Sequence, residues 1–513
     1  MKRRDFLQAT AATCAVALAN PASALPAAFE LDELTISDLQ QGLQSGKYTA
    51  RELVEKYSER ISDIDKKGPA LRSVIEMNPD AEKIAADLDR ERKERGSRGP
   101  LHGIPILIKD NIDTHDRMMT TAGSLALVGA KPARDAFVAQ RLREAGAVIL
   151  GKTNLSEWAN FRSTKSSSGW SARGGQTKNP YALDRNPCGS SSGSGAAVAA
   201  NLCAAAIGTE TDGSIVCPSS ANSLVGIKPT LGLIPGTGII PIAHSQDTAG
   251  PMTRTVRDGA ILLGVLANSR EDYTKYLDND GLRSMRIGIA RKNFGFNDRV
   301  DKLMNGLLDE MKKLGAVLVD PADIPTSGKF DDSEFEVLLY EFKADLNAYL
   351  AGLGPQAPVR SLKDVIEFNE KNRDREMPYF GQDIMIRAEA KGPLTSKAYI
   401  QALRKNHLLT RTQGIDFVMK KHRLDAMVAP TGGPPWPTDW INGDHFSGGY
   451  SSASAVAGYP HITVPAGYVF GLPVGISFFA GANTEPKLLK IAYAFEQATR
   501  IRRPPKFSPN ADF

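Results

Sequence analysis

The sequence predicts an α/β protein. Three observations support this class: predicted strands alternate with predicted helices along the chain, 42% of the residues are apolar, and 24% are charged, as in ordinary soluble globular proteins. With 513 residues the chain is long enough for a large core, and length alone would suggest two to four domains. However, no repeat, low-complexity tract or evident linker divides the sequence.

Residues 1–24 have the pattern of an export signal. Lys2-Arg3-Arg4 gives a charged start with a twin arginine, Ala9–Ala19 is a short apolar stretch, and Ala22-Ser23-Ala24 offers small residues for cleavage. The bland alternative is a chance arginine pair before an ordinary helix. Because the apolar stretch is too short to span a bilayer, we expect export to the periplasm without a stable membrane anchor. The mature domain would then cover residues 25–513.

The N-terminal third contains regular helical and strand patterns. Leu53, Val54, Tyr57 and Ile61 lie near helical spacing, and Thr35 begins a capping pattern. On these patterns we expect helices after Thr35 and over 49–64, 80–95 and 137–145, and strands over 72–78, 101–109 and 147–150.

Lys109 ends an apolar strand that is rich in isoleucine. Such a strand would carry the lysine into the interior. The ordinary alternative is an edge lysine whose ammonium reaches solvent, and the segment by itself favours that alternative.

The stretch from Gly189 to Ser214 contains two small polar loops. It opens with Gly189-Ser-Ser-Ser-Gly-Ser-Gly195 and closes with Gly208-Thr-Glu-Thr-Asp-Gly-Ser214. Ala196–Ala206 lies between them, and its length and alanine content predict a buried helix. Two polar loops joined by one stiff buried element are a suitable place for precise chemistry.

The second half of the chain is also mixed. The glycines and prolines of 226–229 and 247–251 are interpreted as structural turns, with no catalytic role for Lys228 or Asp247. The remaining patterns predict a β-α-β unit over 286–290, 300–314 and 316–320, mainly helical residues over 325–412 that cover an active-site cleft, strands over 424–430 and 462–465, and a closing helix over 486–500.

Two further motif matches would indicate other kinds of site. Residues 146–153 fit the phosphate-loop pattern, but its middle positions are the predicted strand itself, so we reject a phosphate site. Residues 189–193 fit G-x-S-x-G around Ser191, although the preceding Asn186-Pro187-Cys188 is not strand-like. Several histidines are available for a Ser-His triad, so composition does not exclude this alternative: His244, His407, His422, His445 and His461.

Three cysteines remain after Cys14 of the signal segment is set aside. Cys188, Cys203 and Cys217 are an odd number without metal-ligand spacing, so a disulfide framework is not expected. Cys188 and Cys217 flank the two polar loops, and their pairing stays open.

Together with Gly103-Ile-Pro-Ile-Leu-Ile-Lys109-Asp-Asn, the two loops resemble the amidase signature enzymes. The resemblance runs from about residue 34 to about residue 500. It implies one large domain around a mixed sheet of about eleven strands, with helices on both faces. It also implies a catalytic triad of Lys109, Ser190 and Ser214, with a cis peptide bond before Ser190.

In that family the chemistry converts a carboxamide to a carboxylate and ammonia through a seryl acyl-enzyme. Lysine can act as the base only when its amine is neutral, and burial favours that form. The resemblance further implies an oxyanion hole made by the backbone N–H groups of Thr211, Asp212, Gly213 and Ser214. Gly189 and Ser191 would support the site. A rival interpretation makes the Asp212 carboxylate a general base.

Within the family, the blocks at 152–161, 169–176 and 208–218 look most like bacterial peptide amidases, which remove C-terminal amides of peptides. The alternatives are a broad-specificity aliphatic or aryl amidase and, in a different class, a non-catalytic amide-binding protein. We expect no cofactor and no metal, a monomer, and no nucleic-acid partner, because the net charge of +5 is small. The candidate pocket residues are Trp158, Asn160, Phe161, Trp436 and Tyr450. The equal alternative for the aromatic ones is packing in the core.

Overall fold

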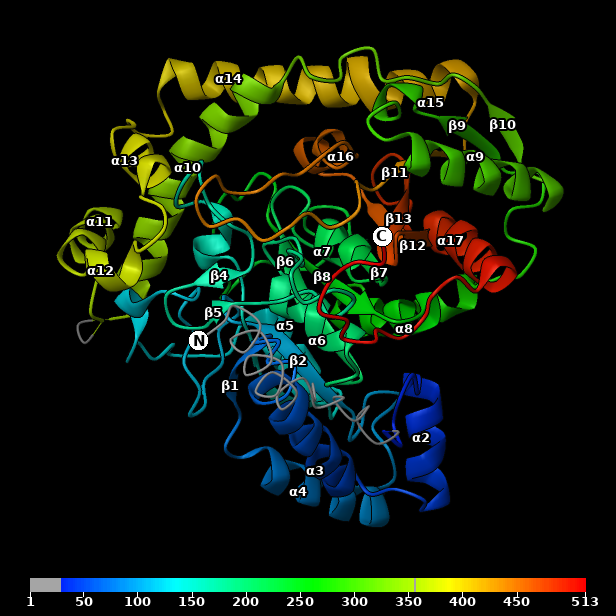
Figure 1. The fold of residues 1–513 in the computed structure, drawn as a ribbon. Helices are drawn as coiled ribbons and strands as arrows, with labels where there is room; N and C mark the ends of the chain where they lie inside the picture. The colour runs from blue at the N-terminus through cyan, green and yellow to red at the C-terminus, as the bar shows by residue number, and fades with distance from the viewer. Residues whose placement is uncertain (1–28, 355–356) are drawn as a thin grey trace, which may run out of the picture. The chain divides into compact units, whose positions relative to one another are not determined.

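Eleven strands form one mixed sheet in the computed structural model (Figure 1). The structure describes residues 29–354 and 357–513, so the predicted signal segment over 1–24 lies outside the described residues. Residues 33–513 form one unit. The strand order is β1-β3-β2-β6-β8-β7-β12-β13-β11-β9-β10. The strand bounds are β1 (Val74–Met77), β2 (Pro105–Lys109), β3 (Val148–Thr153), β6 (Ala205–Glu210), β7 (Val225–Lys228), β8 (Thr248–Thr253), β9 (Arg286–Ile289), β10 (Val317–Val319), β11 (Ala426–Pro430), β12 (His461–Val469) and β13 (Leu472–Phe479).

The sheet combines parallel and antiparallel pairs. β3, β2 and β6 are parallel neighbours, as are β11, β9 and β10, while the strands from β6 through β13 to β11 pair antiparallel. Every residue of β2, β3, β6, β7 and β8 is buried. Both faces of the central strands are therefore covered, as the α/β prediction requires.

Two groups of helices cover the central strands. α6 (Ser192–Ala199) and α7 (Val216–Ala221) contact each other, while α5 (Phe137–Glu144), α8 (Val256–Leu266) and α17 (Glu485–Thr499) form a second contacting series. The predicted single α/β domain with about eleven strands is confirmed.

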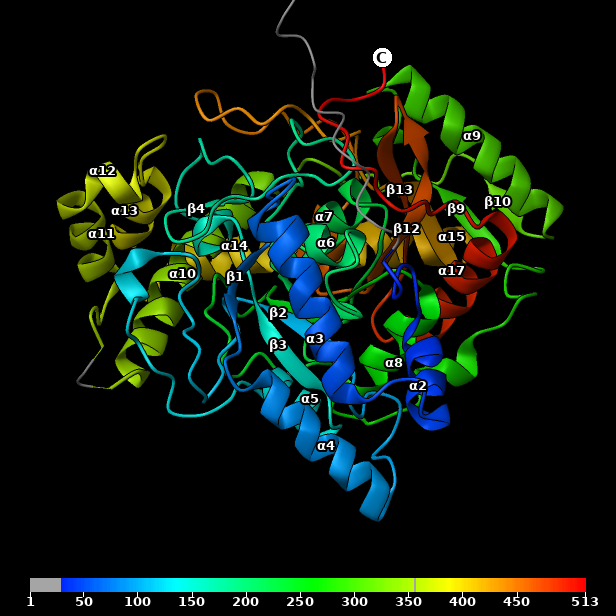
Figure 2. The ribbon, with the colours of Figure 1, turned by 60° about the horizontal axis from the view of Figure 1, so that its bottom comes forward.

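Helices near the N-terminus begin at strong caps. α2 (Ile36–Ser45) and α3 (Ala50–Arg60) each start with a capping box, in which a threonine and an acidic residue satisfy each other's backbone N–H groups. α3 packs beside α4 (Ala81–Arg95) and against β2 (Figure 2). The helix predicted over 49–64 is α-helical only as far as Arg60. The chain then forms a π-helical segment over Ile61–Lys66.

The predicted helix over 196–206 was wrong in its bounds. α6 begins earlier, inside the serine-rich loop, and ends at Ala199. Asn201 has φ 57°, which turns the chain, and β6 begins at Ala205 between β2 and β8. The alanine content that favours a helix is here outweighed by pairing on both sides of a buried strand.

The segments interpreted as glycine and proline turns are strands β7 and β8. A Cβ on Gly226 would lie 2.4 Å from Ser219 Oγ, and one on Gly250 would lie 2.0 Å from Ile227 O. Gly226 therefore makes room for the Ser219 side chain of α7, and Gly250 permits close approach of the β7 backbone. Strand β13 had no counterpart in the sequence prediction.

Residues 325–412 are mainly helical, as predicted. Figure 1 shows these helices at the opposite end of the view from α2, α3 and α4. α10 packs against α13 and α14, and its apolar side chains join a cluster that includes Trp158 and Phe161. The bounds of these helices are α10 (Asp331–Gly352), α11 (Leu362–Lys371), α12 (Arg373–Glu376), α13 (Asp383–Glu389) and α14 (Lys397–His407). Three more helices lie outside this segment: α9 (Asp298–Lys313), α15 (Asp416–His422) and α16 (Ser452–Ala457). In the described part of the chain, none of the helices has the length and apolar character needed to cross a bilayer.

Candidate active site

Lys109 is the last residue of β2, and its side chain is fully buried. Its Nζ lies 2.8 Å from Ser190 Oγ, 2.8 Å from Thr209 Oγ1 and 3.2 Å from Thr209 O. Burial lowers the pKa of Lys109 to about 7, although the nearby carboxylates Asp247 and Glu210 act to raise it. A large share of the lysine is therefore neutral near pH 7, as a base requires.

Ser190 follows a cis peptide bond with Gly189, as the resemblance implied. A Cβ on Gly189 would lie 2.2 Å from Ser156 Oγ, so the position has no room for a side chain. Ser190 is fully buried, and its carbonyl accepts a hydrogen bond from Ser156 N at 3.1 Å. The hydroxyl is thereby held against the Lys109 amine.

Ser214 lies in the turn that follows β6. Glu210 Oε2 accepts hydrogen bonds from Ile215 N at 2.8 Å and Val216 N at 3.0 Å, which fastens the end of this turn. Ser214 is 8% exposed, whereas Ser190 is 0% exposed, so only Ser214 is open to an incoming molecule. In the described part of the chain, no hydrogen bond joins the hydroxyl groups of Ser190 and Ser214.

The turn also presents unused backbone donors. Within the described chain, the N–H groups of Thr211, Asp212, Gly213 and Ser214 donate to no protein acceptor. Gly213 has φ 79°, a conformation that favours glycine. Four consecutive free donors that end at Ser214 are the arrangement that an oxyanion needs.

The contacts of the Asp212 carboxylate give no support to a role as general base. Its Oδ2 accepts a hydrogen bond from Ser452 Oγ at 2.6 Å, and burial raises the pKa of this carboxyl. No hydrogen bond links it to Ser190 or Ser214 in the described residues.

Cys188 and Cys217 form a disulfide, which resolves the pairing that the sequence left open. Cys188 directly precedes Gly189, and Cys217 N donates to Gly213 O at 2.8 Å. The bond therefore links the two loops that carry the serines. Cys203 is a buried free thiol.

A cavity of about 280 Å³ opens beside these loops. Of the predicted pocket residues, Asn160 and Trp436 line it. The others do not: Trp158 and Phe161 pack in the apolar cluster with α10, and Tyr450 stacks on Phe479 in the core. Gly189, Asp212 and Gly213, which the motifs had selected, also line it. Other lining residues were missed, because they come from distant loops and match no local motif. They include Ser168, Asp444, Phe446 and Ser451.

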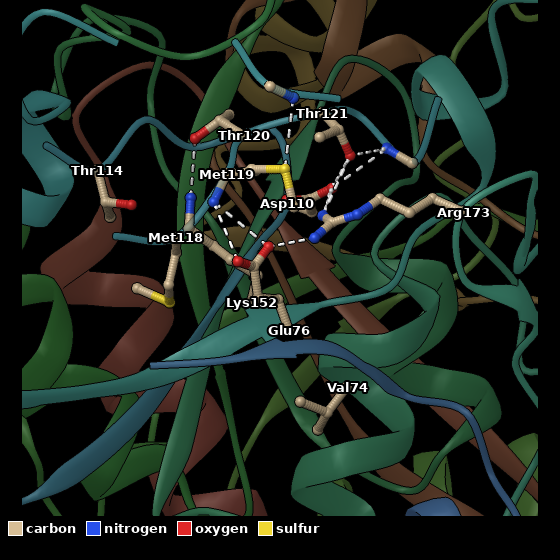
Figure 3. A network of polar contacts seen from close by, with 12 residues as sticks. Val74, Glu76, Asp110, Thr114, Met118, Met119, Thr120, Thr121, Lys152 and Arg173 are labelled. Atoms are coloured by element: carbon tan, nitrogen blue, oxygen red, sulfur yellow. Dashed lines mark hydrogen bonds and ion pairs between the residues drawn. The ribbon is translucent and has the colours of Figure 1, made fainter. Parts of the chain in front are cut away.

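A polar network fixes the chain just after Lys109 (Figure 3). Asp110 is buried, accepts from Thr121 Oγ1 and Gly123 N, and lies 3.4 Å from Arg173 Nη1. Arg173 also pairs with Glu76 of β1. The network thereby ties the end of β2 to β1 and to the loop that contains Arg173.

Lys152 is a second buried lysine, on the neighbouring strand β3. Its amine donates to Ile112 O at 2.5 Å and to Thr120 Oγ1 at 2.9 Å, so it serves the same loop (Figure 3). It makes no hydrogen bond to a serine of the site within the described residues.

The structure gives no support to a Ser-His triad around Ser191. Ser191 Oγ donates to Thr209 O at 3.0 Å and accepts from Thr209 N at 3.2 Å, so its hydroxyl fastens the loop to β6. His461 is buried against Ser477 Oγ at 2.6 Å, and burial lowers its pKa to about 3. No histidine of the described chain bonds to Ser191. Residues 148–153 of the phosphate-loop match are strand β3, which agrees with its rejection.

One group of possible metal ligands comes together, which the sequence analysis did not predict. Atoms of His244, Glu341 and Asp345 lie within 4.8 Å of one another. His244 Nδ1 lies 2.8 Å from Asp345 Oδ2, and Glu341 accepts from Tyr399 Oη and Ser245 N. Because protein groups already bond to these oxygens, the cluster is an ion-pair network.

The fold and the site together define an amide-hydrolysing enzyme, and comparison with known proteins agrees. The Amidase family model matches residues 52–489, so the chain belongs to this family. The chain is 43% identical over 506 residues to a probable amidase of Arabidopsis thaliana, an alignment that covers 94% of this chain and 93% of the relative.

Solved structures are similar over nearly the same length. The native peptide amidase from Stenotrophomonas maltophilia has a TM-score of 0.89 at 49% identity and covers 93% of this chain and 99% of its own. A peptide amidase in complex with the competitive inhibitor chymostatin has a TM-score of 0.90 at 50% identity, covering 93% and 100%. The enzyme is therefore a hydrolase that acts on amides.

Proposed function

We propose that this amidase hydrolyses C-terminal amides of peptides through a seryl acyl-enzyme. The observation that carries the proposal is the 2.8 Å contact between the buried Lys109 Nζ and Ser190 Oγ, beside the more open Ser214. The similarity to peptide amidases over nearly the whole chain supports the choice of substrate class.

In the proposed reaction, Lys109 accepts the hydroxyl proton of Ser190 while Ser190 accepts the proton of Ser214. Ser214 Oγ then forms a bond to the carbonyl carbon. The backbone N–H groups of Thr211, Asp212, Gly213 and Ser214 stabilise the oxyanion. When the C–N bond breaks, the proton returns through Ser190 to the leaving nitrogen, which departs as ammonia. Water attacks the ester and releases the carboxylate.

The hydroxyl groups of Ser190 and Ser214 must come into hydrogen-bond contact during this sequence. Catalytic hydrogen bonds are often long before substrate binds and tighten in the complex. We infer that substrate in the cavity of about 280 Å³ completes this second link.

The test uses ammonia release from a dipeptide amide and mass spectrometry of the enzyme after rapid quenching. An acyl group on Ser214, lost together with turnover in Ser214→Ala, supports the mechanism. An acyl group on Ser191, or full activity in Ser214→Ala, contradicts it. Lys109→Ala should lower turnover by orders of magnitude.

Substrate class is tested separately, with peptide amides, simple aliphatic amides and aryl amides at equal concentration. A clear preference in kcat/KM for peptide amides supports the proposal. Equal values across the three classes favour a broad-specificity amidase, and binding without turnover of any favours an amide-binding protein.

We also infer that the protein is exported to the periplasm by the twin-arginine route. The motif at Lys2-Arg3-Arg4, the short apolar stretch and the small residues at 22–24 support this inference. Fractionation of cells expressing the full chain tests it. Replacement of Arg3 and Arg4 by lysine should leave the protein in the cytoplasm, and unchanged periplasmic recovery would contradict the route.

A further inference from the structure

The Lys109 amine contacts Thr209 as well as Ser190. Three oxygens lie within hydrogen-bond distance of Nζ: Ser190 Oγ at 2.8 Å, Thr209 Oγ1 at 2.8 Å and Thr209 O at 3.2 Å. Two of the three belong to Thr209, near the end of β6, which pairs in parallel with β2. The side chains of Lys109 and Thr209 are both buried.

A neutral lysine amine has two N–H bonds and one lone pair. The carbonyl oxygen of Thr209 can only accept, so it occupies one N–H bond. The other N–H bond and the lone pair are shared between the hydroxyls of Thr209 and Ser190. Lys109 can take a proton from Ser190 only when its lone pair faces Ser190 and its second N–H bond faces Thr209.

We propose that Thr209 is a positioning residue whose two oxygens hold both N–H bonds of the neutral Lys109 amine, so that the lone pair faces Ser190. This inference rests on the proposed function, in which Lys109 is the base. It extends that function to a residue outside the Ser-Ser-Lys set.

The Thr209 hydroxyl is itself fixed in place. Asn111 Nδ2 donates to Thr209 Oγ1 at 3.0 Å, and Asn111 is buried. Thr209 also lines a second cavity, of about 320 Å³, into which its own hydroxyl hydrogen can turn. Its oxygen therefore has one lone pair for Asn111 and one for Lys109.

The same oxygens suit the protonated lysine. After proton transfer, the three N–H bonds of the ammonium match the three oxygens one to one. Because a hydrogen bond to a charged donor is stronger than one to a neutral donor, Thr209 stabilises the ammonium form that develops during attack. Loss of the Thr209 hydroxyl should therefore slow the reaction and lower the pKa of Lys109 further.

Other charged groups near Lys109 are accounted for. Asp247 precedes β8 and Glu210 ends β6, and both act to raise the pKa of Lys109. On β3, Lys152 directs its amine to Ile112 and Thr120. None of these three side chains hydrogen-bonds to Lys109 in the described structure, and all are unchanged by substitution of Thr209.

The experiment measures kcat and the pH profile of kcat/KM for a peptide amide with Thr209→Val, Thr209→Ser and Thr209→Ala. In Thr209→Val, which keeps the shape of the side chain, kcat should fall by about 10- to 100-fold. The midpoint of the profile should move about 1 unit to lower pH. Thr209→Ser should restore both values. If the valine variant does not fold, Thr209→Ala replaces it, with the same expected fall in kcat and shift of the midpoint.

Thr248→Val is the matched control. Thr248 lines the same cavity of about 320 Å³, and its hydroxyl donates to Ala249 O at 3.1 Å, away from Lys109. Its midpoint should equal that of the wild type. A lower rate in Thr209→Val without a shift of the midpoint, or wild-type values in that variant, would overturn the inference. Activity retained in Lys109→Ala would instead overturn the proposed function.

Discussion

The disulfide between Cys188 and Cys217 joins the residue that precedes the Gly189–Ser190 bond to the helix that follows Ser214. Both sulfur-bearing residues also line the cavity beside the site. The bond therefore holds together the two loops between which a proton passes in the proposed reaction.

Reduction of this disulfide is expected to lower both stability and activity. The cross-link spans 29 positions in the sequence, for which the loss of chain-entropy constraint is about 3–4 kcal/mol. Thermal unfolding and ammonia release, each with and without dithiothreitol, measure the two effects. Cys203→Ala, which removes the free thiol, should respond to reductant as the wild type does. If the double variant Cys188→Ser, Cys217→Ser kept full activity and the same Tm, the bond would have no such role.

The rate of hydrolysis is expected to depend on pH through Lys109. Because burial lowers its pKa to about 7, the ammonium form, which cannot accept a proton, dominates below that pH. We expect kcat/KM to rise about tenfold per unit of pH below 7 and to level off above it. Burial also lowers the pKa of Lys228, to about 8, but its amine contacts Pro229 O. Lys228→Met should therefore keep the midpoint, and a flat wild-type profile would rule out a lysine base.

Arg162 is expected to be essential for stability. It is fully buried, lies 2.6 Å from Glu157 Oε1, and donates to Glu376 O of α12. Arg162→Met would leave the buried carboxyls of Glu157 and Glu376 without their cation, which should cost about 3–5 kcal/mol in urea unfolding. The matched control is Arg373→Met, which breaks an exposed pair with Glu370 and should cost less than about 1 kcal/mol. Equal losses in the two variants would contradict this role.

The sequence predicted the parts of the fold that have clear local patterns. The helix capped by Thr35, the start of the helix near Thr49, the β-α-β unit over 286–320 and the α/β class are all confirmed. Strands such as Val225–Lys228 were missed because glycine and proline within them usually indicate turns. There, pairing with strands on both sides and the room that Gly226 leaves for the Ser219 side chain outweigh local preference.

The residues of the candidate site were likewise predicted only in part. Motif order placed Lys109, Ser190 and Ser214 in one region, and the structure brings Lys109 and Ser190 into contact. Thr209 and Asp444 could not be selected from the sequence, because their roles depend on which strands and loops become neighbours. Trp158 and Tyr450 were predicted as pocket residues, with core packing as the alternative, and their rings lie in the core.

Trp436 lies in the wall of a cavity, whereas Tyr450 lies in the core. Trp436 lines the cavity of about 280 Å³, packs against Cys188, and donates from Nε1 to Asp444 at 3.2 Å. Tyr450 stacks on Phe479, and its hydroxyl contacts Ser454.

Trp436→Ala should therefore raise KM for a dipeptide amide about tenfold, because it removes a large apolar contact surface from the cavity wall. Tyr450→Phe should leave KM and kcat near the wild-type values, while the lost hydrogen bond costs about 1 kcal/mol of stability. Ammonia-release kinetics and thermal unfolding measure both variants. An unchanged KM in Trp436→Ala, together with a raised KM in Tyr450→Phe, would mean that the peptide binds outside this cavity.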